Sequence, residues 1–148
     1  MVNPFDLRAI LLAKHAQHVV LIHFPIALFI TGVVFDLSSR GKPASQLASA
    51  AYFNLSAAAL TVLPAVATGV LAWQFALEGK RLKGLLLLHL MAASFAALLV
   101  IASWCVHWRM RKAEPVLLPR YRIPIELLGV AAIALTAHLG GFLSGVNA

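Results

Sequence analysis

Four long apolar runs constrain this chain more than any other feature of its sequence. They cover about residues 17–37, 48–77, 84–107 and 123–143. Each is long enough to cross a bilayer as an α-helix, which takes roughly 20 residues. Backbone polar groups in lipid must be satisfied within the segment itself, and the two-residue alternation of a membrane β-strand is absent. The runs therefore predict four transmembrane helices.

The composition excludes a soluble enzyme and a disordered chain. Of the 148 residues, 61% are hydrophobic and 11% are charged, and the mean hydropathy is +0.90. Soluble proteins have roughly 45–50% apolar and ~25% charged residues. So few charges cannot cover the apolar surface of a small soluble domain, and so many apolar residues do not remain unfolded.

The basic residues are expected to flank the membrane segments rather than to bind nucleic acid. The net charge of +7 comes from 12 Lys and Arg against 5 Asp and Glu. Such residues set topology and meet anionic lipid headgroups. Seven lie after the first and third runs and five on the other side, which favours the first side as cytoplasmic and both termini as periplasmic. The seven are Arg40, Lys42, Arg109, Arg111, Lys112, Arg120 and Arg122, and the five are Arg8, Lys14, Lys80, Arg81 and Lys83.

Short connections between the runs predict an all-α, up-down four-helix bundle. Consecutive helices joined by short loops run antiparallel, so residues 1–148 form a single four-helix transmembrane domain. Pro25 and Pro64 predict kinks in the first and second helices. Asn3 and Pro4 predict the start of a short interfacial helix over residues 4–14. The sequence shows no internal repeat.

Histidines gather at one depth of this expected bundle. The start of the first span, the start of the third and the end of the fourth face the same side. His23, His89 and His138 then each lie roughly 7–9 Å below that surface, with His18 above them near the interface. His107 lies at the opposite end. Each histidine could simply bond a neighbouring helix, but a common depth favours a shared ligand site.

The ligand types favour haem. The carboxylates Asp36, Glu114 and Glu126 lie towards the other side, which disfavours a carboxylate-bridged di-iron centre. The single cysteine, Cys105, cannot hold an iron–sulfur cluster. Haem needs only two axial imidazoles, whereas zinc or copper on three or four histidines remains open.

Axial ligands of one haem should come from diagonal helices, because adjacent helices pack only about 8–10 Å apart. His23 and His89 are the favoured pair. His138 and His18 are expected to hydrogen-bond around the cofactor or to ligate a second haem. At the cofactor site, Gly69 would allow close approach and Arg81 would meet a haem propionate. The alternative role of Gly69 is helix packing, and that of Arg81 is lipid contact.

Several short motifs resemble a known family over about residues 15–146. In order along the chain they are His18-x-x-x-x-His23-Phe24-Pro25-Ile26-Ala27-Leu28, Pro64, Thr68-Gly69, Trp73, His89 and His138-Leu139-Gly140-Gly141. They resemble the bacterial four-helix membrane proteins of the "domain of unknown function 2231" family. The chain departs from the family's pattern in two places. Val19 stands where relatives often have proline. After the last motif, the family's usual tail continues to a Tyr and a Gly-Val, and here it is Phe142-Leu143-Ser144-Gly145-Val146.

The resemblance implies a protein of the bacterial inner membrane in a redox setting, because some relatives look fused to Rieske or cytochrome domains. The leading hypothesis is a b-type cytochrome-like subunit with one haem b, or two. It would pass electrons between a partner redox protein and the quinone pool, within a larger redox complex or a homo-oligomer. The alternatives are a non-redox scaffold or assembly subunit and a histidine-bound zinc or copper site. No nucleophile–base–acid set indicates an enzyme acting alone.

Overall fold

The computed structural model describes residues 13–39, 42–112 and 119–145, and they form an all-helical bundle. The helices are α2 (Lys14–Ser38), α3 (Gln46–Leu71), α4 (Gly84–Arg111) and α5 (Arg122–Leu143), with a π-helical turn η1 (Ala72–Ala76) after α3. All four long helices are apolar enough to cross a membrane, and α3 continues through η1 as one span to Phe75. The predicted all-α, four-span fold is therefore confirmed. The expected interfacial helix at residues 4–14 lies almost wholly outside the described residues.

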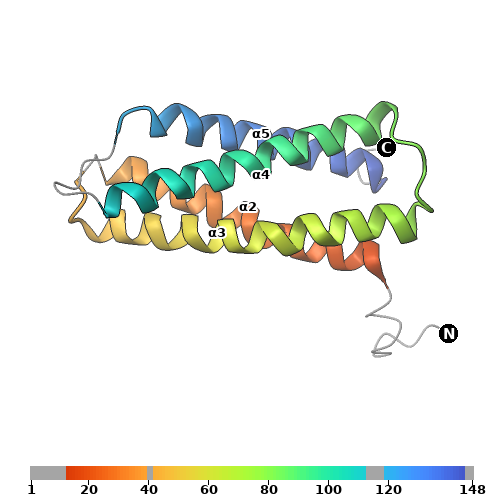
Figure 1. Ribbon diagram of the computed structural model, residues 1–148, viewed down its shortest axis with the longest axis horizontal. Coiled ribbons are helices and arrows are strands. Elements are labelled where there is room, and N and C mark those ends of the chain that lie inside the picture. Colours follow the sequence, from red (N-terminus) through yellow and green to blue (C-terminus); the bar gives the residue numbers. More distant parts are fainter. Residues whose placement is uncertain (1–12, 40–41, 113–118, 146–148) are drawn as a thin grey trace.

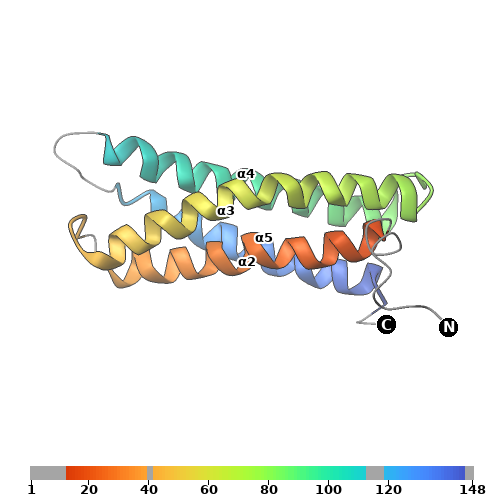
Figure 2. The ribbon, with the colours of Figure 1, turned by 90° about the horizontal axis from the view of Figure 1, so that it is seen from below.

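The helices follow one another around the bundle, and consecutive helices run antiparallel (Figures 1 and 2). The closest pairs are α2 with α3 and α4 with α5, so the molecule consists of two tight hairpins. Contacts of α3 with α4 and of α2 with α5 join the hairpins. This order makes α2 and α4 diagonal neighbours, as the short loops predicted.

Polar side chains inside the spans bond the backbone of their own helix. Asn54 Nδ2 donates to the Ala50 carbonyl at 2.9 Å, and the Thr61 and Thr136 hydroxyls donate to the carbonyls four residues earlier at 2.7 Å. Lipid offers these groups no water, so internal bonding removes the cost of placing them there. Both α2 and α3 continue through their prolines, Pro25 and Pro64.

The end of α4 differs from its sequence-based boundary at about residue 107. Helix α4 continues to Arg111, where the guanidinium lies 4.5 Å from the centre of the Tyr52 ring. Cation–π contacts of this kind stabilise a charged helix end at the membrane surface. At the other end of α4, the turn before it is held by Trp73, whose Nε1 donates to the Lys80 carbonyl at 2.8 Å.

The buried core occupies one half of the bundle. The buried residues of α4 all lie at Ala96 or later, and those of α5 all lie at Ile133 or earlier. Phe29 lies at the centre of this half, under Gly129 of α5. The half that contains the start of α4 and the end of α5 has few buried side chains, so the two hairpins are loosely packed there.

The core positions of the first hairpin recur 71 residues later in the second. Phe29 and Asp36 of α2 correspond to Val100 and His107 of α4, and all four are buried. In α3 and α5 the corresponding buried positions are Ala51 and Arg122, Leu55 and Glu126, Ala58 and Gly129, and Val62 and Ile133. Such a match is expected for hairpins related by an approximate two-fold axis along the bundle. This repeat is not evident in the sequence because these corresponding core residues differ in type.

Candidate functional site

His18 lies near the start of α2 and packs against α3. Its Nδ1 is 3.1 Å from the Ala65 carbonyl oxygen and 3.3 Å from Thr68 Oγ1. A Cβ added to Gly69 would lie 3.0 Å from His18 Cε1. Gly69 thus makes room for the imidazole ring rather than for a second helix backbone.

His89 makes the same arrangement in the second hairpin. Its Nδ1 is 3.2 Å from the Thr136 carbonyl oxygen of α5, and a Cβ added to Gly140 would lie 3.2 Å from His89 Cε1. These three positions follow their counterparts His18, Ala65 and Gly69 by the same 71 residues. The two histidines therefore occupy equivalent places on the diagonal helices α2 and α4.

These contacts fix the tautomer of both rings. A carbonyl oxygen can only accept a hydrogen bond, so the Nδ1 that faces it carries the proton, and in the neutral ring the lone pair then lies on Nε2. An Nδ1–H bonded to a carbonyl, with Nε2 as the ligand atom, is the usual arrangement around metal-binding histidines. The geometry thus suits coordination through Nε2 of both rings.

His23, His138 and Arg81 lie at the same end of the bundle with exposed side chains. His23 Nδ1 lies 2.6 Å from the Val19 carbonyl oxygen of its own helix, and the His138 ring contacts the Phe142 ring edge-to-face at 5.0 Å. Within the described chain no hydrogen bond joins His23 to His89. Arg81 lies between η1 and α4.

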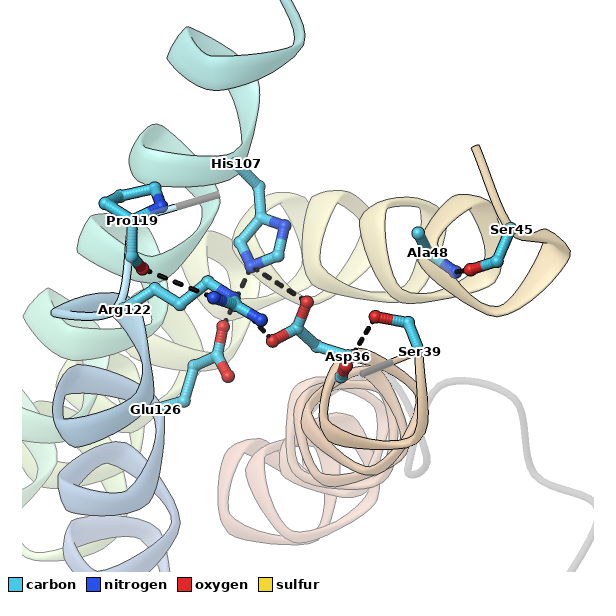
Figure 3. A network of polar contacts seen from close by, with 8 residues as sticks. All are labelled: Asp36, Ser39, Ser45, Ala48, His107, Pro119, Arg122 and Glu126. Atoms are coloured by element: carbon cyan, nitrogen blue, oxygen red, sulfur yellow. Dashed lines mark hydrogen bonds and ion pairs between the residues drawn. The ribbon is translucent and has the colours of Figure 1, made fainter. Parts of the chain in front are cut away.

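A second cluster of polar side chains lies near the opposite end of the bundle (Figure 3). It consists of Asp36 on α2, His107 on α4, and Arg122 and Glu126 on α5; we call it the polar cluster. Their exposed fractions are 0%, 2%, 5% and 0%. Asp36 lies 18 residues after His18 on α2, or about 27 Å along the helix. The two clusters thus lie close to opposite membrane surfaces.

Hydrogen bonds and ion pairs connect the polar cluster across three helices. Arg122 Nε donates to Asp36 Oδ2 at 2.7 Å, and Arg122 Nη1 donates to the Pro119 carbonyl at 3.3 Å. His107 Nε2 lies 2.8 Å from Glu126 Oε1 and 3.9 Å from Asp36 Oδ1. Ionisable groups buried within membrane spans are costly, and they usually mark functional sites.

This cluster was not predicted from the sequence, although the signal was present. Asp36 lies near the end of the first span, His107 near the end of the third, and Arg122 and Glu126 near the start of the fourth. Their positions along the spans place these four residues at one depth on the side opposite the histidines. The carboxylates were instead used only to argue against a di-iron site at the histidine end.

Together the four spans, the histidines at one end and the buried polar cluster at the other define a multi-pass membrane protein with titratable side chains gathered at each end. The family model described as "Predicted membrane protein (DUF2231)" matches residues 14–146. The chain belongs to this family, as the sequence motifs indicated. Neither the curated proteins nor the solved structures gave a match.

Proposed function

We propose that this protein binds haem b at the histidine end of the bundle and transfers electrons in the bacterial inner membrane. The observation that carries the proposal is the matched pair of His18 and His89. Each ring has its Nδ1 against a carbonyl of the neighbouring helix and its edge against a glycine. Two oriented imidazoles on diagonal helices are the donor set that a six-coordinate haem requires.

The axial pair we propose is His18 and His89. It differs from the pair that the sequence favours, His23 and His89, because the His23 ring is exposed and its Nδ1 contacts its own helix. His23 and His138 lie beside the proposed site. Few side chains are buried at the start of α4 and the end of α5, and the proposed haem would lie between the hairpins there.

Bound haem would supply one-electron redox chemistry, and the chain would tune it through the ligands and their hydrogen bonds. The Ala65 and Thr136 carbonyls orient the two imidazoles. Arg81 and Lys83, both exposed at this end, are suited to meet propionates. The apolar outer surface keeps the site away from bulk water.

The expected partners follow from the membrane setting. Large exposed apolar side chains cover the helices, so the chain suits a bilayer and contact with other membrane subunits. We propose that electrons pass between a partner redox protein and the quinone pool, within a larger complex or a homo-oligomer. The excess of basic residues at the polar-cluster end favours that end as cytoplasmic and both termini as periplasmic.

The absorbance spectrum of protein expressed with ample haem tests this proposal. We expect a Soret band and reducible α and β bands in the wild type. His18→Ala and His89→Ala should each lose this low-spin spectrum, whereas Ser94→Ala, an exposed change on α4 in the same half, should keep it. Circular dichroism establishes that each variant is folded.

Two results would contradict the proposal. Wild-type protein without a Soret band would exclude haem and leave a non-redox scaffold or assembly subunit. If His23→Ala removed the haem and His18→Ala kept it, the axial pair would be His23 and His89.

A further inference from the structure

The polar cluster contains more buried oxygen atoms than its own hydrogen bonds satisfy. Three buried oxygen atoms have no hydrogen-bond partner among the described residues: Asp36 Oδ1 and Glu126 Oε2 of the cluster, and Ser103 Oγ outside it. Ser103 lies four residues before His107, on the same face of α4. An unsatisfied buried carboxylate oxygen costs at least as much as a lost hydrogen bond. The cluster therefore carries acceptor capacity that its own donors do not use.

The 71-residue correspondence between the two hairpins indicates that Ser103 lies beside Glu126. Gly32 and Leu55 of the first hairpin are in contact, since a Cβ added to Gly32 would lie 3.0 Å from Leu55 Cδ2. Their counterparts 71 residues later are Ser103 and Glu126. The CH2OH group of Ser103 thus replaces a glycine hydrogen, and the carboxylate side chain of Glu126 replaces the isobutyl group of Leu55.

The charge of the cluster also leaves room for a cation. Asp36 and Glu126 bring two negative charges, and Arg122 brings one positive charge that it directs at Asp36 Oδ2. If Glu126 is ionised, this second carboxylate needs another positive charge. A protonated His107 could donate Nε2–H to Glu126 Oε1, yet that bond leaves Asp36 Oδ1 and Glu126 Oε2 without partners.

We infer that Asp36, His107 and Glu126 form a binding site for a divalent transition-metal ion such as Zn²⁺. Each residue offers one ligand atom, and these atoms lie within 4.8 Å of one another. Ligands about 2.1 Å from a tetrahedral zinc ion are about 3.4 Å apart. The distances from His107 Nε2 of 2.8 Å and 3.9 Å lie on either side of that value.

The neighbouring residues suit this role. One imidazole with two carboxylates is a borderline-to-hard donor set, which favours Zn²⁺, Mn²⁺ or Fe²⁺ over copper(I). Arg122 holds Asp36 by Oδ2, so that Oδ1 faces His107 (Figure 3). The ion would join α2, α4 and α5, and with three protein ligands it would keep a coordination position for water or for Ser103.

Zinc content of the full-length protein in detergent tests the inference. Protein washed with EDTA, loaded with Zn²⁺ and desalted should retain one zinc per chain. Glu126→Gln and Asp36→Asn should each lose at least tenfold in zinc affinity. His23→Gln, which changes an exposed histidine at the other end, should bind zinc as the wild type does. Zinc is measured separately from haem iron, so the result is independent of the proposed haem.

A wild-type measurement keeps the test decisive if a variant fails to fold. Zn²⁺ should raise the Tm of EDTA-washed wild-type protein by several degrees, because a ligand of the native state stabilises it. Wild-type protein that retained no zinc and showed no shift with Zn²⁺ or Mn²⁺ would overturn the inference and leave a closed ion-pair network. Zinc retained by folded Glu126→Gln and Asp36→Asn but lost from His23→Gln would locate the ion at the histidines and would also overturn it.

Discussion

Single glycines determine how closely the helices of this bundle approach. Gly129 shows this most clearly, because a Cβ added there would lie 2.7 Å from Phe29 Cζ. Phe29 is fully buried and cannot move into solvent or lipid. The approach of α5 to α2 therefore depends on the missing side chain at Gly129, as small residues allow in membrane helices.

Gly129→Ala should destabilise the protein although alanine is the better helix former. The change gains about 1 kcal/mol of helix propensity, and overpacking against Phe29 costs about 1–3 kcal/mol. Unfolding in mixed micelles measures the net effect. In a Phe29→Leu background the overpacking should largely disappear. Equal effects of Gly129→Ala in both backgrounds would show that the Phe29 contact does not limit the packing.

The pairing of Arg122 with Asp36 should be revealed by removing one partner and then both. Arg122→Met leaves a buried carboxylate without its guanidinium and should cost about 3–5 kcal/mol. Adding Asp36→Leu should recover most of that loss, since an apolar pair of similar volume has no charge to desolvate. Thermal unfolding of the two variants provides the comparison. A double variant as unstable as Arg122→Met alone would argue against the pairing.

At the scale of helices, the sequence predicted most of the fold because lipid imposes simple requirements. Span length, apolar composition and short loops led to four antiparallel helices, with α2 and α4 diagonal. The extension of α4 to Arg111 was missed because it depends on a tertiary contact with Tyr52. Likewise, η1 is a local change of hydrogen-bond pattern that span length does not reveal.

The candidate sites were only partly predictable. Position along each helix places His18, His23, His89 and His138 at one end, and the structure agrees. Rotation about the helix axis distinguishes the inward His18 and His89 from the exposed His23 and His138, and a nearly uniform apolar sequence carries little information on rotation. The positions of its residues along the spans could have revealed the polar cluster. Its contacts could not be predicted in this way, because they depend on how three helices pack together.

The antiparallel order predicts where introduced cysteines react in a Cys105→Ala background. Lys83→Cys, in the turn before α4, and Ser144→Cys, after α5, should label from the same side of membrane vesicles, which is the periplasmic side in the proposed orientation. Lys42→Cys, in the connection between α2 and α3, should label from the cytoplasmic side. All three side chains are exposed in the structure. Labelling of Ser144→Cys and Lys42→Cys from one side would contradict the arrangement of spans.

At the scale of the whole molecule, the two ends of the bundle differ in whether equivalent positions of the two hairpins carry the same residue. The histidine end keeps equivalent residues in both hairpins, with His18 and His89 each facing a carbonyl and a glycine. The polar cluster places unlike residues at equivalent positions, Asp36 against His107 and Leu55 against Glu126. A pair of identical histidines across an approximate two-fold axis suits the one shared cofactor that we propose, whereas unlike pairs suit an asymmetric charge cluster.

The haem-to-protein ratio of the purified full-length wild type tests the central claim most directly. His18 and His89 are one pair related by one axis, so the account predicts one haem per chain with two axial histidines. The pyridine haemochrome assay gives the haem, and amino-acid analysis gives the protein. A ratio of one that falls to zero in folded His89→Ala is the expected result, and a wild-type ratio of zero after expression with ample haem would contradict the account.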